Sequence, residues 1–204
     1  MNYFVTAIGT DSGKTVASAI LAEALGADYW KPVQAGRPTD SDFIRKVVSP
    51  GRVRIHQEQY LLKTPISPHA AAAAENLKIS ISDIILPETS NSLIIEGAGG
   101  ILVPLNDDEM MIDLVPHLNA AIILVCNIYL GSINHSLLSL ELIRSRGYPL
   151  RGIIFNGPRV SATEKIIMKY ANVDCLLHIH EEKNITRQVI AKYAAALKNT
   201  LNIK

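Results

Sequence analysis

The stretch that decides the fold is Phe4-Val5-Thr6-Ala7-Ile8-Gly9-Thr10-Asp11-Ser12-Gly13-Lys14-Thr15-Val16. The β-branched and aromatic run 3–8 predicts a buried strand, and the Ala-rich run 16–25 predicts a helix. The loop between them ends in Gly-Lys-Thr, which is the arrangement of a phosphate-binding P-loop. In such a loop backbone N–H groups face an anion, Lys14 adds charge near the terminal phosphates, and the Thr15 hydroxyl can ligate Mg²⁺. The sequence therefore predicts a nucleoside triphosphate site at its start.

One position departs from the strict P-loop pattern. The pattern has a glycine five residues before Gly13, where this chain has Ile8, and its nearest glycine is Gly9. The alternative is an ordinary strand-to-helix turn with a solvated Lys14. The placement of Gly-Lys-Thr between an N-terminal strand and a helix favours the P-loop.

Composition sets limits on the class of protein. The chain has 204 residues with 20 basic and 19 acidic side chains, so its balanced charge argues against nucleic-acid or membrane partners. Residues 1–204 suit one P-loop ATPase or ligase domain. No secretion signal or membrane-spanning run is visible. The two separate cysteines, Cys126 and Cys175, favour reduced thiols, and we expect a cytoplasmic enzyme.

Apolar runs alternate with helical segments along the chain. Strands are expected at 3–8, 28–31, 92–96, 121–126, 152–156 and 175–179. Helices are expected at 14–25, 41–48, 67–75, 81–85, 111–118, 135–146, 162–170 and from 186 to about 201. The strand runs are continuously apolar, as in strands covered on both faces. The pattern predicts an α/β, P-loop NTPase-like fold with a mostly parallel sheet flanked by helices on both faces.

Chemical side chains follow the expected strands at the end where such sheets bind ligands. Lys31 follows the second strand and provides a second cation facing Lys14 across the γ-phosphate, unless it is a lysine that reaches solvent from a strand end. Glu96 ends the third strand in the position of a magnesium-binding carboxylate. Asp40 and Asp42 precede a helix, and spacing alone does not decide which is a metal ligand and which only a cap.

Two further groups have both a functional and a structural interpretation. His69 follows Ser67-Pro68 at a helix start, where a hydrogen-bonded structural histidine is favoured over a general base. Ser132 and Asn134 open a helix, so they either form a second anion site or are plain caps.

Together these pieces carry a family resemblance. They are Phe4-Val5-Thr6, Gly13-Lys14-Thr15-Val16, Lys31-Pro32-Val33, Ser41-Asp42, Ser67-Pro68-His69, Glu96-Gly97-Ala98-Gly99-Gly100, Leu130-Gly131-x-Ile133-Asn134-His135 and Asn156. In this order the chain resembles the dethiobiotin synthetase family. The Glu-Gly-Ala-Gly-Gly piece is shared with related amidating ATPases, whereas the Lys31 and Leu130 pieces together are more specific.

The resemblance implies an ATP-dependent ring closure in biotin biosynthesis. An amine of 7,8-diaminopelargonate takes up CO₂ (or bicarbonate) to give a carbamate, and the carbamate attacks the γ-phosphate of MgATP. The neighbouring amine then closes the cyclic urea and expels phosphate, without a covalent enzyme intermediate. The resemblance also implies a homodimer, with the site at the interface and the helix opening at Ser132 receiving the substrate's carboxylate from the partner.

The same resemblance implies roles for individual residues. Lys14 and Lys31 would be catalytic, and Thr15, Asp42 and Glu96 would hold Mg²⁺. Nucleotide contacts would come from Asp11, Ser12, Gly13, Lys14, Thr15, Val16, Asp42, Glu96, Gly97, Ala98, Gly99, Asn156 (at the adenine), Gly157 and His180. Substrate contacts would come from Thr10, Ala35, Ser67, Ser132 and Asn134.

The chain departs from the family at three places. Ala7 stands where the loop usually begins with glycine, so we expect Gly9 to make the tight turn. Ala35 stands where serine or threonine is common, so a hydroxyl contact is absent or replaced by Gln34. Ile179-His180 replaces an isoleucine-proline near the base-binding loop.

Two other protein classes share the P-loop. A partitioning ATPase typically has an extra lysine early in the loop, where this chain has Gly9, and a basic or amphipathic surface. An amidating ATPase of the cobyrinic-acid type needs a glutamine-hydrolysing domain, for which 204 residues leave no room. Turnover that depends on a diamine and bicarbonate, rather than on DNA or lipid, separates the synthetase from the partitioner.

Overall fold

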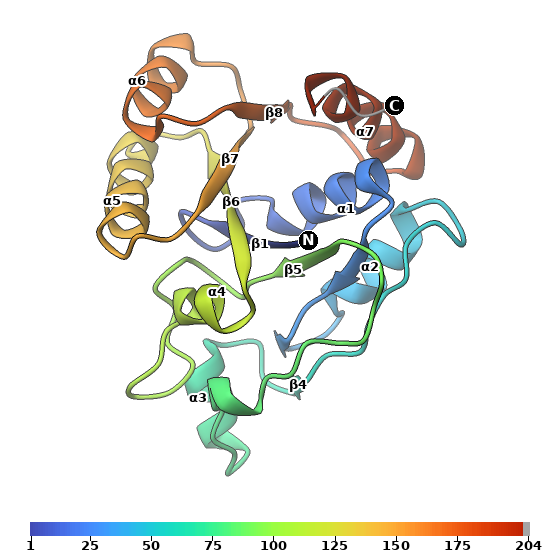
Figure 1. The fold of residues 1–204 in the computed structure, drawn as a ribbon, viewed down its shortest axis with the longest axis vertical. Helices are drawn as coiled ribbons and strands as arrows, with labels where there is room; N and C mark the ends of the chain where they lie inside the picture. Colours follow the sequence, from blue (N-terminus) through green and yellow to red (C-terminus); the bar gives the residue numbers. More distant parts are fainter. Residues whose placement is uncertain (202–204) are drawn as a thin grey trace.

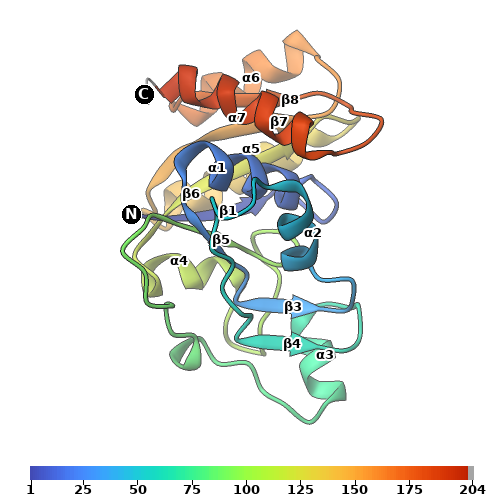
Figure 2. The same cartoon turned by 90° about the vertical axis from the view of Figure 1, so that its right-hand side faces the viewer.

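The computed structural model describes residues 1–201 and contains a six-stranded, wholly parallel sheet between two layers of helices (Figures 1 and 2). The strand order is β2-β5-β1-β6-β7-β8. The strands are β1 (Asn2–Ala7), β2 (Asp28–Trp30), β5 (Leu93–Glu96), β6 (Ala120–Asn127), β7 (Leu150–Asn156) and β8 (Cys175–Ile179). A separate two-stranded parallel sheet pairs β3 (Val33–Ala35) with β4 (Tyr60–Leu62).

Helices cover both faces of the main sheet, and each face has its own core. One core contains side chains of α1 (Lys14–Leu25), α2 (Asp40–Val47) and α7 (Arg187–Leu201). The other contains side chains of α3 (Pro68–Ala74), α4 (Leu114–His117), α5 (Ser132–Ser145) and α6 (Ser161–Ala171). Neighbouring strand residues such as Phe4 and Val5 enter opposite cores, so the strands read as continuous apolar runs. The predicted fold class is confirmed.

The strand register brings three sequence motifs to one edge of the sheet. Val5 pairs with Glu96, and Trp30 pairs with Ile95. Lys31, which follows Trp30, therefore comes level with Glu96 beside the loop that follows β1. This is also where the chain order reverses between β1 and β6, the usual place for a ligand in an open α/β sheet.

The element boundaries differ from those expected at several places. The second strand ends at Trp30 rather than at residue 31, and the helix expected from 135 begins at Ser132. Region 81–85 forms only the 3₁₀ turn η1 (Ile81–Asp83), and region 111–118 divides into η2 (Met111–Asp113) and α4. The strands β3 and β4, of three residues each, were not expected from the sequence.

Two observations concern the environment of the chain. Within residues 1–201, no helix has both the length and the hydropathy needed to cross a bilayer. Cys126 and Cys175 are both free thiols. Burial raises the pKa of the Cys126 thiol to about 12, so this side chain behaves as a small apolar core group.

Candidate active site

The loop between β1 and α1 has the geometry of an anion cradle. Helix α1 begins after Gly13, which has a left-handed backbone (φ +89°), and no side chain caps the helix. The first N–H groups of an uncapped helix have no partner within the helix, so they are free to bind an anion. The loop's other left-handed residue is Asp11, with φ +55°. Gly9 lies in the bend that follows β1 and does not have a left-handed backbone.

The Lys14 ammonium lies inside this loop rather than in solvent. Its Nζ donates to the Gly9 carbonyl at 3.3 Å, and the residue is 7% exposed. Burial lowers the pKa of Lys14 to about 8; the positive charge of Lys31 acts in the same direction, and the negative charge of Glu96 opposes it. The two ammonium groups are therefore close enough to influence each other.

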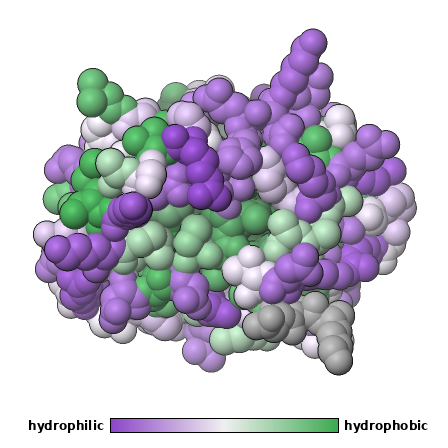
Figure 3. Space-filling model, turned by 90° about the horizontal axis from the view of Figure 1, so that it is seen from above, coloured by the Kyte–Doolittle hydropathy of each residue, from purple (hydrophilic) through white to green (hydrophobic). Residues whose placement is uncertain are grey.

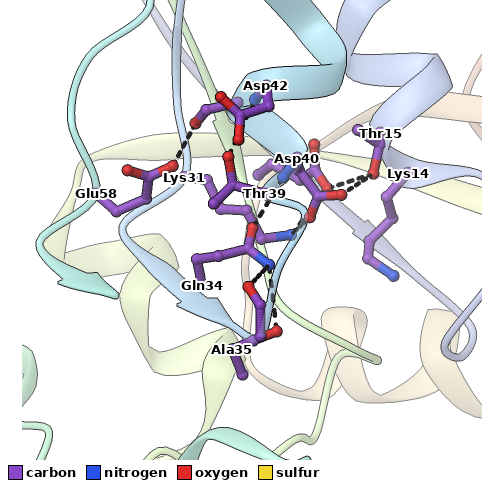
Figure 4. Close-up of polar contacts among 12 residues, drawn as sticks. Lys14, Thr15, Lys31, Gln34, Ala35, Thr39, Asp40, Asp42 and Glu58 are labelled. Carbon is purple, nitrogen blue, oxygen red and sulfur yellow. Dashed lines mark hydrogen bonds and ion pairs between the residues drawn. The ribbon is translucent and has the colours of Figure 1, made fainter. Parts of the chain in front are cut away.

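Glu96 is the centre of a buried polar cluster. Its Oε1 accepts hydrogen bonds from the Thr15 hydroxyl at 2.9 Å and from Lys31 Nζ at 3.0 Å. Asp40 also pairs with Lys31, and its Oδ1 lies 3.1 Å from the same Thr15 hydroxyl (Figure 4). Burial by itself lowers the pKa of Lys31, but the charges of Glu96 and Asp40 outweigh burial and hold that pKa above its usual value. Lys31 is therefore a buried ammonium ion and not a solvent-exposed strand-end lysine.

The cluster contains Asp40 rather than Asp42. The Asp42 carboxylate lies 2.9 Å from the Arg45 guanidinium on the exposed side of α2. In Figure 4 Asp42 lies beyond Thr39, whereas Asp40 reaches Thr15. Residues two apart in a helix point about 200° apart, so only one of the two can face the loop. The contacts with Thr15 and Lys31 therefore favour Asp40 over Asp42, the residue chosen from the sequence, as the candidate metal ligand.

A cleft of about 860 Å³ opens above this cluster. A volume of this order suits a small-molecule site. Its lining includes many residues that the sequence predicts for nucleotide or substrate: Thr10, Asp11, Gly13, Lys14, Thr15, Val16, Lys31, Ala35, Ser67, Glu96, Ala98 and Gly99. Asp40 and Gln34, which the sequence analysis names as alternatives at the metal and at the substrate, also line it. The lining residues to which sequence reasoning gave no role are Pro38, Thr39, Phe43, Pro65, Ile66, Pro68 and Val103.

Gln34 shapes the cleft wall through the backbone. Its amide nitrogen donates to the carbonyl of Ala35 at 3.3 Å, and its oxygen accepts from the Asp40 N–H at 3.1 Å. The side chain thus fixes the start of α2 and with it the position of Asp40. It does not offer these groups as a replacement for the hydroxyl missing at Ala35.

Ser12 and Asn156 support the loop from behind instead of lining the cleft. The Ser12 hydroxyl donates to the Gly9 carbonyl at 3.0 Å, within the loop. Asn156 Nδ2 donates to the Ser12 carbonyl at 3.0 Å, and a Cβ on Gly13 would lie 2.4 Å from that nitrogen. Gly97 packs against the Phe4 ring, and Gly157 donates its N–H to Ile179 at the end of β8. Asn156 thus ties the loop to the end of β7.

His180 lies away from the cleft, at the end of β8. Its ring is 4.7 Å from that of His178, and both line a second hollow of about 420 Å³ with Lys192 and Tyr193 of α7. Figure 3 looks onto this side of the molecule and shows apolar surface at its centre bordered by hydrophilic side chains.

Ser132 and Asn134 are also outside the cleft of this chain. Ser132 is completely buried and its hydroxyl has no hydrogen-bond partner among residues 1–201, while Asn134 is exposed. Gly131 precedes them in a left-handed conformation (φ +104°), and α5 has no side-chain cap. Ser67 lies within hydrogen-bond distance of His69, at 3.1 Å on the surface.

The oxygen atoms around Thr15 fit a magnesium ion. Carboxylates and a hydroxyl are hard ligands of the kind that Mg²⁺ prefers, and such an ion usually takes only one or two carboxylates plus phosphates and water. Within residues 1–201 no group of three or more His, Cys, Asp or Glu forms a self-sufficient metal site. The pair Asp40 and Glu96 beside Thr15 suits an ion that arrives with a nucleotide.

Comparison with known proteins places this geometry in a family. A family model described as "AAA domain" matches residues 1–189. The ATP-dependent dethiobiotin synthetase BioD of Cytophaga hutchinsonii is 53% identical over 197 residues, covering 96% of both chains. The protein of that name from Christiangramia forsetii is 46% identical and covers 98% of this chain and 97% of its own.

A solved structure agrees in fold alone. The septum site-determining protein MinD of Pyrococcus horikoshii, complexed with Mg-ADP, is 14% identical, with a TM-score of 0.55. It covers 100% of this chain and 98% of its own. The fold is therefore that of P-loop NTPases, and the sequence relatives narrow the assignment further. The chain belongs to the family of ATP-dependent dethiobiotin synthetases.

Proposed function

We propose that the protein is an ATP-dependent cyclo-ligase that converts 7,8-diaminopelargonate and CO₂ to dethiobiotin in biotin biosynthesis. The observation that carries the proposal is the convergence of Lys14 and Lys31 on one cleft, next to the uncapped start of α1. The cleft thus offers two cations and a phosphate cradle to a substrate that is itself an anion. Relatives named for this activity support the same reaction.

The chemistry follows from the charges in the cleft. One amine of the diamine adds to CO₂ and releases a proton, giving a carbamate anion. A carbamate oxygen attacks the γ-phosphorus of ATP and ADP leaves, so a carbamic–phosphoric anhydride forms. The second amine attacks the anhydride carbonyl and loses a proton, phosphate leaves, and the cyclic urea closes. No side chain has to form a covalent intermediate.

The two lysines stabilise charge at successive points of this sequence. The free N–H groups of α1 and Lys14 receive the nucleotide phosphates, and Lys14 leaves the Gly9 carbonyl to do so. Lys31 moves from its carboxylate partners towards the carbamate and the γ-phosphate, where negative charge accumulates.

Mg²⁺ is the proposed companion of the nucleotide. Thr15, Asp40 and Glu96 would hold it, and when bound it would neutralise charge on the β- and γ-phosphates. The purine would lie towards the ends of β7 and β8, near Asn156, Gly157 and His180; those two strands are neighbours and end at the same edge of the sheet.

A homodimer is proposed to complete the substrate site. Large apolar side chains are exposed around the start of α5: Leu130 is 103% exposed, Leu138 62% and Ile133 38%. A second copy packed on this face would bring the α5 N-terminus, with Ser132 and Asn134, to the open side of its partner's cleft. An uncapped helix start there suits the carboxylate of the substrate's tail.

We propose the domain organisation, the location and the partners of the protein in the same way. Residues 1–204 act as one ligase domain in the cytoplasm, which agrees with the continuous sheet and with the two free thiols. The partners are small molecules and a second copy, with neither nucleic acid nor membrane required.

Purified protein incubated with ATP, Mg²⁺, diaminopelargonate and bicarbonate tests the proposal. We expect dethiobiotin by mass spectrometry, with ADP and phosphate in equal amounts, and no turnover when the diamine is omitted. ATP hydrolysis that ignores the diamine and is stimulated by DNA or lipid vesicles would contradict it and favour a partitioning ATPase.

A further inference from the structure

Tyr29 supplies a contact to Glu96 that no motif of the sequence indicates. Its hydroxyl donates to Glu96 Oε2 at 2.9 Å, and both side chains are buried. The other oxygen, Oε1, accepts hydrogen bonds from Thr15 and Lys31. Each oxygen of this carboxylate therefore has its own set of donors, and only the Oε1 set belongs to the nucleotide cleft.

The backbone holds Tyr29 rigidly. On one side β2 pairs with β5, and Tyr29 is the partner of Ile94. On the other side its N–H donates to the Arg54 carbonyl at 2.8 Å, and its carbonyl accepts from the His56 N–H at 2.9 Å. The ring is fully buried in the core beneath α1. A side chain fixed in this way can orient the group that it contacts.

The chemistry of the contact has one direction. A carboxylate oxygen has no hydrogen to donate, so the Tyr29 hydroxyl is the donor and Glu96 Oε2 the acceptor.

Within residues 1–201, no other group donates to Oε2. Without Tyr29 this buried oxygen would have an unmet acceptor, and the carboxylate could turn to share its existing donors.

We propose that Tyr29 is a positioning residue that fixes the Glu96 carboxylate so that Oε1 stays directed at Thr15 and the metal side of the cleft. The need arises because Lys31, the other strong partner of Glu96, is expected to leave when substrate binds. Tyr29 is the partner that does not move. The inference rests on the proposed role of Glu96 towards Mg²⁺ and adds a residue to it.

The main measurement is a binding experiment that needs no diamine. Calorimetry gives the affinity of the full-length protein for ADP with and without Mg²⁺. The ratio of these two affinities is called the magnesium-dependent gain. For Tyr29→Phe we expect ADP binding without Mg²⁺ to be unchanged and the gain to fall about tenfold, the scale of a hydrogen bond to a charged group. Kinetically, the apparent Mg²⁺ constant should rise more than kcat falls.

Tyr60→Phe is the matched control, because that hydroxyl accepts only a distant backbone contact from Ser80 at 3.4 Å and lies outside the cleft. Its magnesium-dependent gain should equal that of the wild type. A double-variant cycle with Glu96→Gln separates positioning from stability, since Tyr29→Phe should change the gain little once the carboxylate is gone.

Three results would overturn the inference. The first is a Tyr29→Phe protein with a lowered melting temperature but an intact magnesium-dependent gain. The second is an equal effect of Tyr29→Phe on that gain in the Glu96 and the Glu96→Gln proteins. The third is a wild-type protein whose ADP affinity does not change with Mg²⁺. Failure of the proposed function would differ, because it would appear as absent dethiobiotin while the magnesium binding data remained as expected.

Discussion

Lys31 Nζ lies 3.0 Å from Glu96 Oε1, a buried contact between residues 65 positions apart. Because Asp40 pairs with the same ammonium, Lys31 is held by two carboxylates before any substrate is present. In the proposed reaction a phosphate or carbamate would compete for this ammonium, and a metal ion would take its place on the carboxylates. Such an exchange of cations at Glu96 would link nucleotide binding to the positioning of Lys31.

Replacing Lys31 with glutamine should remove the charge that stabilises the reacting oxyanion. For Lys31→Gln we expect kcat to fall by about 100-fold or more, as for the loss of a transition-state donor, with ATP affinity largely kept. Steady-state turnover and calorimetric ATP binding measure the two effects. Lys46→Gln, on the exposed side of α2, is the control and should behave as wild type. Normal turnover of Lys31→Gln would remove this residue from the catalytic set.

The two aspartates of α2 should differ in their effect on magnesium. Asp40 contacts Thr15 and Lys31, whereas Asp42 pairs with Arg45 in solvent. We expect Asp40→Asn to raise the apparent Mg²⁺ constant about tenfold, and Asp42→Asn to change it by about twofold at most. Equal effects in a Mg²⁺ titration of activity would mean that both carboxylates reach the metal.

These two aspartates show which features of the site can be predicted from the sequence and which cannot. The sequence predicts the P-loop, the parallel sheet and the positions of Lys31 and Glu96 at strand ends. These features depend on runs of apolar residues and on where each run stops, which are local signals. The sequence does not predict which of Asp40 and Asp42 faces the loop, because that depends on where α2 begins and on how the helix is rotated about its axis. Thr39 caps the helix by accepting from the Asp42 N–H, and the Gln34 side chain adds a contact to the Asp40 N–H that the sequence pattern does not reveal.

Tyr29 was missed for a related reason. In the sequence it is one more aromatic residue of a buried strand, and nothing local marks its hydroxyl. Only the parallel register of β2 against β5 brings that hydroxyl to Glu96, 67 positions away. Ser132 and Asn134 remain predictions of another kind, because their proposed role needs a second chain.

Nucleotide binding should be coupled to proton uptake at Lys14. In the ligand-free protein its pKa is lowered to about 8, mainly by burial. Phosphate anions favour the ammonium form and raise this pKa, so above pH 8 binding takes up a proton and affinity falls as pH rises. Below pH 8 the proton is already present and this group adds no pH dependence.

Calorimetry in buffers of different protonation enthalpy measures the uptake. Lys14→Arg is the informative variant, because a guanidinium keeps its charge throughout this range and should abolish the uptake. An uptake that persists in Lys14→Arg would assign it to another group.

Gly13 should not tolerate a side chain. A Cβ there would lie 2.4 Å from Asn156 Nδ2, and φ is +89°. For Gly13→Ala we expect ATP affinity to fall at least about tenfold, since strain in this backbone region alone costs about 1–2 kcal/mol and the clash adds to it. The double variant Gly13→Ala/Asn156→Ala should recover only the part due to the clash.

Gly147→Ala gives the cost of a positive φ without a clash. Gly147 has φ +66°, and a Cβ there would meet nothing within 4 Å. We expect a small loss of thermal stability and unchanged ATP affinity. If Gly13→Ala is no worse than Gly147→Ala by either measure, the loop does not require glycine for close approach to Asn156.

Charges on the exposed apolar face of α5 should dissociate the proposed dimer. Leu130→Asp/Leu138→Asp places two carboxylates on side chains that are 103% and 62% exposed in the single chain. We expect the dimer dissociation constant to rise by about 100-fold or more, the scale of two interface anchors lost, with sedimentation velocity reporting the monomer. Leu77→Asp, at an apolar side chain 50% exposed beyond α3, is the control and should stay dimeric.

Because the α5 N-terminus is proposed to serve the partner's cleft, diamine-dependent turnover should fall with the dimer fraction and return at high protein concentration. A monomeric wild type with full turnover would place the substrate's carboxylate within a single chain.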